Sequence, residues 1–126
     1  MLDDLVRQLA QELEMDPITP LEKGHYRIPL AGEIKVDMMQ LPHAFLFKSA
    51  ICTPPNKNKE LFYSNLMQAN LFAQGTRGAS IGLDADAHVL TLSLELSYNS
   101  SYTVFKEKLE DFVSVLEFWR TEAVKL

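Results

Sequence analysis

The chain has 126 residues, which is long enough for a single domain, predicted over residues 1–126. Its formal net charge of −5 argues against nucleic acid or an anionic membrane as the main partner, because both need a basic face. Hydrophobic residues make up 47% of the chain, which excludes a disordered tail, and the single cysteine, Cys52, excludes an internal disulfide and a Cys-rich metal cluster. The acidic start argues against a signal peptide, and the absence of about 20 consecutive apolar residues argues against membrane insertion. We therefore expect an intracellular protein.

The first segment predicts an amphipathic helix. Its apolar residues recur at intervals of three and four, with charged and amide side chains between them. Pro17 and Pro20 are expected to end this helix. The apolar stripe consists of Leu2, Leu5, Val6, Leu9 and Leu13.

Three extended runs follow, at residues 26–30, 33–38 and 44–51. In the second run Ile34, Val36 and Met38 alternate with charged residues, as in a strand with one apolar face. The short connection at residues 31–32 predicts a hairpin between the first two runs. Pro29 has no N–H to donate, which places the first run at a sheet edge or at the end of a strand.

The third run is apolar on both faces. Phe45, Phe47 and Ile51 point to one side, while Leu46 and Ala50 point to the other. Helices can cover one of these faces. The other face meets a partner or is covered by a further helix or loop, and the pattern leaves both possibilities open.

The second half predicts a helix over residues 59–72, strands over 79–83 and 89–96, and a final helix over 102–123. Gly75 lies where a helix C-terminal glycine is expected. The element order is therefore α-β-β-β-α-β-β-α, an α+β fold with a mostly antiparallel, twisted sheet and helices packed on it. The final helix carries an apolar stripe of Tyr102, Phe105, Leu109, Phe112, Leu116 and Trp119.

No catalytic or metal-binding constellation emerges from the sequence, and no cofactor is expected. His25, His43 and His88 lie on separate elements without a partner at ligand spacing. Cys52 ends an apolar strand and is expected to be a buried or half-buried, inert thiol. The acidic turn after residue 83 lacks the glycine of a calcium loop.

A short glycine loop, Gly75-Thr76-Arg77-Gly78, follows the second predicted helix. It lacks the Gly-Lys-Ser/Thr ending of a Walker phosphate loop. It also joins a helix to a strand, whereas the comparable KH loop joins two helices. We interpret it as a sharp turn that permits close approach of a neighbouring chain.

Residues 66–84 read LMQANLFAQGTRGASIGLD, which strongly resembles the signature of the class I type III secretion chaperones, the Tir chaperone (CesT-like) family. In that family an Ala-Asn-Leu-Phe helix end runs into a glycine-rich turn and a Gly-Leu-Asp strand. Arg77 stands where the family usually has a glycine. The final helix, with Phe105, Leu109, Phe112 and Trp119, also resembles that of the family.

The resemblance implies a homodimer, or a heterodimer, in the bacterial cytoplasm. Such a protein binds the N-terminal region of secreted effectors, keeps it extended for secretion and catalyses no reaction. The first helix and first three strands would hold the client, while the second helix and following strand would pair the subunits. The implied client-binding residues are Leu5, Leu9, Leu13, Ile28, Leu30, Ile34, Val36, Met38, Phe45 and Phe47. The implied dimer-interface residues are Phe62, Leu66, Ala69, Asn70, Phe72, Ile81 and Leu83.

Two other classes of function stay open at the level of sequence. One is a regulatory protein of the same fold that sequesters a transcription factor or a secretion-gate factor. The other is a small enzyme, which would require a deep polar pocket with a buried titratable cluster.

Overall fold

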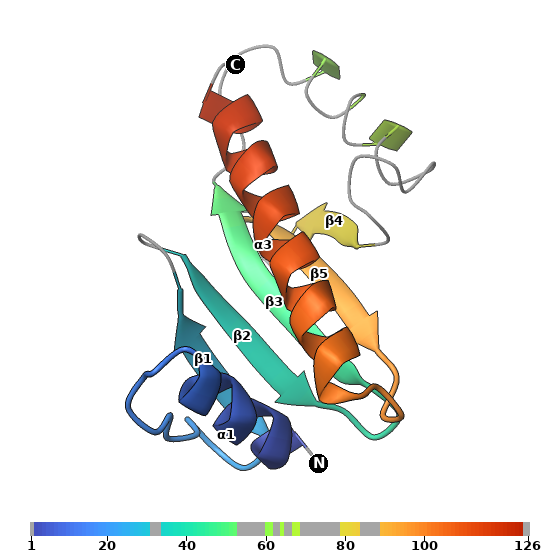
Figure 1. Cartoon of the computed structure of the whole chain (residues 1–126). Helices are drawn as coiled ribbons and strands as arrows, with labels where there is room; N and C mark the ends of the chain where they lie inside the picture. The colour runs from blue at the N-terminus through green and yellow to red at the C-terminus, as the bar shows by residue number, and fades with distance from the viewer. Residues whose placement is uncertain are drawn as a thin grey trace. The chain divides into compact units, whose positions relative to one another are not determined.

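A computed structural model describes residues 2–30, 34–52, 60–61, 64, 67–68, 79–83 and 89–124. Two helices and five strands have defined bounds within these ranges (Figure 1). The predicted α+β class and the mostly antiparallel sheet are confirmed. In chain order the elements are α1 (Leu2–Glu12), β1 (His25–Pro29), β2 (Lys35–Gln40), β3 (Phe45–Cys52), β4 (Ser80–Leu83), β5 (Leu90–Leu96) and α3 (Tyr102–Val124).

The five strands form one sheet in the order β1-β2-β3-β5-β4, so β1 and β4 are its edges. The pairs β1–β2, β2–β3 and β4–β5 are antiparallel. Pro29 is the last residue of β1, opposite Lys35, which confirms that the first predicted strand is an edge strand. The predicted turn at residues 31–32, the Gly75 loop and the acidic turn after residue 83 lie outside the described residues.

The predicted second helix lies mostly outside the described residues. Its described positions, at 60, 61, 64, 67 and 68, are helical. The side chains of Leu61 and Met67 are 57% and 71% exposed.

The chain divides into two compact units. The first comprises Met1–Lys48 and Glu95–Leu109, and the second comprises Ser49–Leu94 and Glu110–Leu126. The expectation of a single domain over residues 1–126 stays a prediction.

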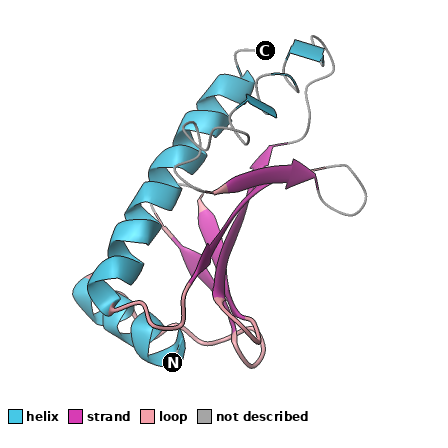
Figure 2. Ribbon diagram, turned by 90° about the vertical axis from the view of Figure 1, so that its right-hand side faces the viewer, coloured by secondary structure: helices cyan, strands magenta, loops and turns pink. Residues whose placement is uncertain are grey.

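The core of the first unit lies between its helical segments and its strands. Figure 2 shows α1 and the first turns of α3 on one side of the sheet. Phe105 of α3 is fully buried and contacts Phe47 of β3 edge to face, with ring centroids 5.4 Å apart. Phe45 makes a similar contact with Tyr98 at 4.9 Å. Burial alternates along β1 and β2, because side chains of one strand point to opposite faces.

The second unit buries the other half of the final helix's stripe. Phe112, Leu116 and Trp119 are at most 7% exposed, which confirms the predicted stripe. Arg120 follows them and donates a hydrogen bond from Nη2 to the carbonyl oxygen of Ala50, 2.9 Å away. Cys52 is half-buried, and burial raises the pKa of its thiol, as expected of an inert cysteine.

Helix α1 ends at Glu12, well before the prolines that were expected to end it. The amide of Met15 donates to the carbonyl of Ala10 at 2.9 Å, and the amide of Glu14 donates to that of Gln11 at 3.2 Å. Glu14 has a φ of 54°, so these bonds form a Schellman motif with Glu14 in the left-handed position. The helix is therefore closed by its own backbone, and Pro17 and Pro20 shape the connection after it.

A three-residue cluster links α1 to α3 within the first unit. The carboxylate of Glu12 accepts hydrogen bonds from the Tyr102 hydroxyl and from Lys106 Nζ. The hydrogen bond from Lys106, followed by that from Tyr102, holds the pKa of Glu12 below its ordinary value of 4.5. The cluster fixes the C-terminal end of α1 beside the first turn of α3.

We expect Glu12→Gln to lower the thermal unfolding midpoint at pH 7, with the difference from wild type shrinking as the pH falls. A carboxyl whose pKa is depressed by folding adds stability above its unfolded pKa, near 4.5, and loses it as the pH falls through the folded pKa. Thermal melts between pH 3 and pH 7 measure this. Glu110→Gln, at an exposed position of α3, is the matched control and should show no such convergence. Parallel pH profiles for wild type and Glu12→Gln would contradict the assignment.

Candidate functional site

A groove of about 570 Å³ lies in the first unit, between α1, the connection that follows it and the start of β1. Apolar side chains such as Val6, Ala10 and Ile18 form much of its wall. Charged groups lie among them, from Asp3, Arg7 and Lys23. The remaining lining residues are Gln11, Met15, Pro17, Pro20, Gly24 and Tyr26.

The connection between α1 and β1 is shaped by its sequence. The Schellman motif turns the chain away from α1, and Pro17 and Pro20 restrict the backbone that follows. Gly24 has a φ of 76°, a conformation that favours glycine, and its carbonyl accepts a hydrogen bond from the amide of Gln40 at 2.8 Å. This residue therefore aligns the chain with β2 at the point where β1 begins.

Tyr26 joins the two walls of the groove. Its side chain is buried, and its hydroxyl donates a hydrogen bond to the Asp3 carboxylate of α1. Burial, followed by the hydrogen bond to Asp3, raises the pKa of Tyr26 to about 12. The phenol therefore stays protonated at neutral pH and keeps donating to one oxygen, Oδ1, of the Asp3 carboxylate.

Strand β1, whose residue Tyr26 lines the groove, is an edge strand of the sheet. In an antiparallel pair, alternate residues direct both backbone polar groups toward the neighbouring strand. The backbone groups of Gly24 and Leu30 bond to Gln40 and Ile34, on the β2 side, so the even-numbered residues of this segment face β2. The odd-numbered residues His25, Arg27 and Pro29 therefore direct their backbone polar groups outward, away from β2. The outward backbone groups of His25 are already bonded, because its amide donates to the carbonyl of Glu22 and its carbonyl accepts from the amide of Leu21.

Arg27 therefore offers an outward N–H and C=O to which no described residue bonds, and Pro29 offers a carbonyl alone. Unpaired backbone groups on an edge strand are the template on which an added strand forms. The free stretch of this edge is short, because the turn at Glu22 occupies one end and Pro29 lacks a donor at the other.

An ion cluster lies on the opposite face of β1 and β2 from α1. Arg27 Nε and Nη2 donate to the two carboxylate oxygens of Asp37, at 2.8 and 3.3 Å. Burial raises the pKa of Asp37, but Arg27 and, to a smaller extent, His25 together lower it by more, so the net shift is downward. His25 lies between two carboxylates, with Nδ1 3.6 Å from Glu22 and Nε2 3.6 Å from Asp37. These contacts order the edge strand from the face that the groove does not use.

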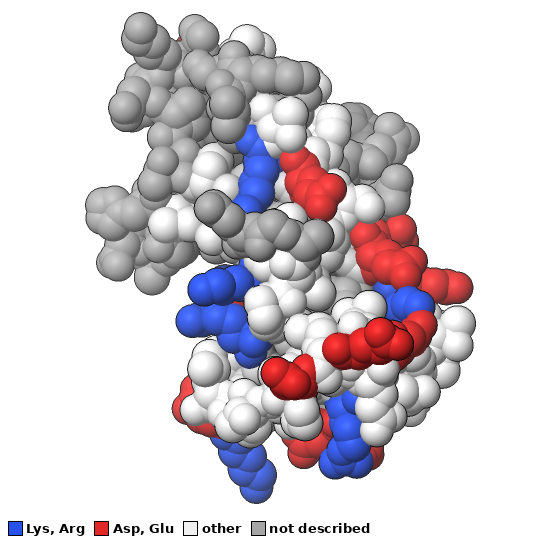
Figure 3. All heavy atoms as spheres, turned by 60° about the vertical axis from the view of Figure 1, so that its left-hand side comes forward, with Lys and Arg blue, Asp and Glu red and all other residues white. Residues whose placement is uncertain are grey.

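The groove and edge together are suited to hold an extended peptide. Main-chain groups at Arg27 can pair with a backbone, and the apolar wall can receive a side chain. Within the described residues, no three or more His, Cys, Asp or Glu side chains are arranged to hold a metal ion. On the face drawn in Figure 3, acidic and basic side chains lie next to one another. No described helix has the length and hydropathy to cross a membrane.

The residues predicted for client binding lie elsewhere than in the groove. None of the ten lines it. Most are core residues, and only three keep substantial accessible surface: Leu5 and Leu30 are half-buried and Leu13 is 44% exposed. The buried ones, each at most 6% exposed, are Leu9, Ile28, Ile34, Val36, Met38, Phe45 and Phe47.

The residues predicted for the dimer interface fall mainly outside the described part of the chain. Ile81 is 7% exposed on β4, the second edge strand. Leu83 ends that strand, and its side chain is not described. The other five, Phe62, Leu66, Ala69, Asn70 and Phe72, lie outside the described residues.

Comparison with known proteins points to one family. The model of the Tir chaperone protein (CesT) family matches residues 4–120. A protein of Chlamydia pneumoniae is 26% identical over 125 residues, covering 97% of this chain and 95% of that protein.

Solved structures share the fold over nearly the full length. The HopA1-SchA chaperone-effector complex contains a chain with a TM-score of 0.78 and 15% identity, covering 95% of this chain and 93% of that one. The Yersinia pestis type III secretion chaperone SycH, solved with a stable fragment of YscM2, gives a TM-score of 0.68 and 21% identity, covering 100% of this chain and 99% of that one.

Proposed function

The chain belongs to the Tir chaperone protein (CesT) family, and on this premise we propose that it binds the N-terminal segment of a type III secreted effector and keeps it extended for secretion. Related structures support the proposal, because one is a chaperone-effector complex and another is a type III secretion chaperone with a partner fragment. The proposal includes action in the bacterial cytoplasm without catalysis.

Two observations carry this proposal: no described residue bonds to the outward backbone groups of Arg27, and the residue before it in β1, Tyr26, lines the apolar groove. An extended client would add a short strand at β1 and place an apolar side chain in the groove, against Ile18 and Val6. In this proposal Leu5, Leu13 and Leu30 contact the client, whereas the buried members of the predicted set support the surface from within.

Ile18→Asp should abolish client capture while sparing the fold. Ile18 lines the groove and is half-buried, so a carboxylate there would place a charge where the client's apolar side chain enters, and the client would desolvate it. That costs several kcal/mol, and every 1.4 kcal/mol weakens binding about tenfold. The measurement is capture by the tagged chain in its own cell, with the captured proteins identified and quantified by mass spectrometry.

Val104→Asp is the control, because Val104 is 40% exposed on α3 and does not line the groove. It should capture the same client as wild type. Equal capture by Ile18→Asp and Val104→Asp would rule out the groove as the client site. If the captured protein were a transcription factor or a secretion-gate factor, the regulatory alternative would replace the effector assignment.

We further propose that two copies pair through the second helix and β4, as a homodimer. The exposed Leu61 and Met67 and the position of β4 at the sheet edge support this. Light scattering at micromolar concentration should give about twice the chain mass of 14.3 kDa. Phe72→Asp should shift the mass toward the monomer, because obligate interfaces are apolar at their centre. A wild-type mass near 14.3 kDa would contradict the dimer.

A further inference from the structure

The charged groups around the groove are not equally available to a ligand. Asp3 is the acidic residue of the lining, and its carboxylate already accepts the hydrogen bond of Tyr26. Lys23, on the connection, forms no ion pair with any described residue. The lining therefore carries one carboxylate, one oxygen of which already accepts a hydrogen bond, and a lysine that has no ion pair with a described residue.

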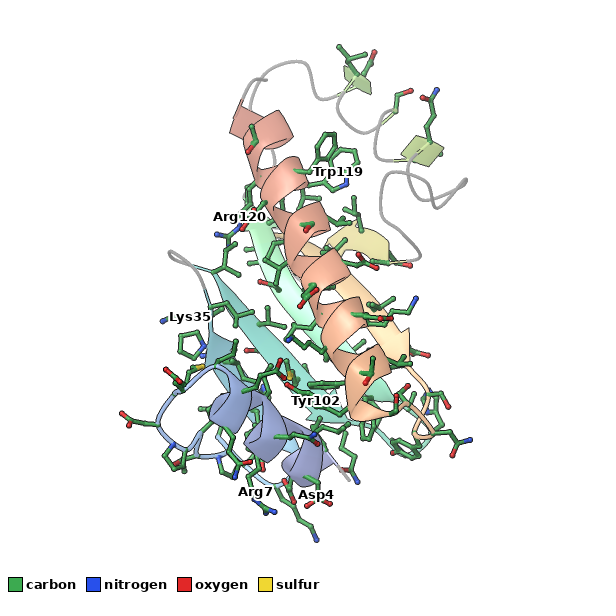
Figure 4. The ribbon with its side chains drawn as sticks, in the orientation of Figure 1. Asp4, Arg7, Lys35, Tyr102, Trp119 and Arg120 are labelled. Atoms are coloured by element: carbon green, nitrogen blue, oxygen red, sulfur yellow. The ribbon has the colours of Figure 1, made fainter. Side chains whose placement is uncertain are left out.

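Arg7 is the second cation of the lining, and its ion pair is weak. Its Nη1 lies 3.3 Å from Asp4, and the two side chains are 68% and 73% exposed. Figure 4 shows Asp4 and Arg7 side by side on α1. Exposed ion pairs contribute little free energy, so Arg7 can exchange Asp4 for a carboxylate of a ligand.

From these contacts we infer that the groove selects client segments in which an acidic residue adjoins the apolar residue that enters it. Lys23 and Arg7 act as the specificity-determining residues. The lining holds two cations and one carboxylate, so a client carboxylate would meet Lys23 and Arg7, whereas a client lysine would meet two like charges and only the second oxygen of Asp3. This inference rests on the proposed function of the groove.

The local charge thus opposes the charge of the whole chain. With a net charge of −5, the protein as a whole attracts basic partners. Screening limits that long-range attraction to about 8 Å at physiological ionic strength, so groups in contact at the groove decide which side chain fits. The net charge of the chain would favour basic clients, whereas the groove lining predicts a preference for clients with an acidic residue next to the apolar one.

The probe is a library of random 12-residue peptides displayed on phage and selected on the purified full-length protein. Enriched peptides are then synthesised with a fluorescent label, each in an acidic form and in a Glu→Lys or Asp→Lys form. Their affinities are measured by anisotropy for wild type, Lys23→Glu and Lys108→Glu. Lys108 is exposed on α3 outside the groove, so both variants change the net charge equally.

For wild type and Lys108→Glu, the acidic peptide should bind about fivefold more tightly than its lysine form, as expected of an exposed ion pair of up to about 1 kcal/mol. For Lys23→Glu the preference should vanish or reverse, and adding 0.3 M salt should weaken it for wild type. Enrichment of basic peptides, or the same preference in all three proteins, would overturn the inference while leaving the proposed function standing. Equal binding of selected peptides to wild type and Ile18→Asp would overturn both, because the peptides would not occupy the groove.

Discussion

Val36→Asp should unfold the protein. Val36 is 0% exposed in β2, opposite Ile28, which is also 0% exposed. An unpaired charge in a core costs several kcal/mol, which is a large part of the 5–15 kcal/mol that typically stabilises a domain. Circular dichroism and thermal melts should show the loss of the cooperative transition or a midpoint lowered by more than about 15 °C.

Val104→Asp provides the comparison, because it makes the same chemical change at a position that is 40% exposed. It should shift the free energy of unfolding by less than about 1 kcal/mol. A folded Val36→Asp that fails only in client binding would instead make the Val36 face a binding surface, as the resemblance had suggested.

Phe105→Ala should destabilise the protein by about 3–5 kcal/mol, the usual cost of emptying a buried aromatic site. Phe105 is 0% exposed and makes the edge-to-face contact with Phe47 that joins α3 to β3 in the first unit. Chemical denaturation followed by circular dichroism measures the change, with the slope on denaturant checked for two-state behaviour.

Phe118→Ala is the matched variant on the same helix, at a side chain that is 52% exposed and touches Trp119. Its cost should be below about 1 kcal/mol. Similar losses for the two variants would mean that Phe105 does not anchor the core in the way its burial indicates.

Most of the fold could be predicted from periodicity. Alternation in the second strand identified Val36 and Met38 as one face, and both are 0% exposed. Three- and four-residue spacing identified the buried stripe of α3. Strand bounds shifted by one or two residues, as at β2, because alternation defines a face more sharply than it defines an end.

The site was less predictable, for a physical reason. An apolar pattern marks a residue that avoids water, but it does not tell whether the cover comes from the same chain or from a partner. Ile28 and Phe47 were therefore assigned to the client and are covered by their own subunit. The groove depends instead on Glu14 and Gly24, whose left-handed backbone bends an aperiodic connection around Ile18. The usable signal in the sequence was the proline pair in that connection, between an amphipathic helix and an edge strand.

The short length of the free edge on β1 affects how strongly the protein resists aggregation at high concentration. A long, bare edge strand invites pairing with another copy and growth into insoluble aggregates. Here the Glu22 bridge occupies the backbone of His25, and Pro29 cannot donate, so the exposed hydrogen-bonding stretch is centred on Arg27 alone. Two such edges would gain too few bonds from each other to start a fibril. A ligand that also fills the groove would gain more, so the same few residues would favour the proposed client over self-association.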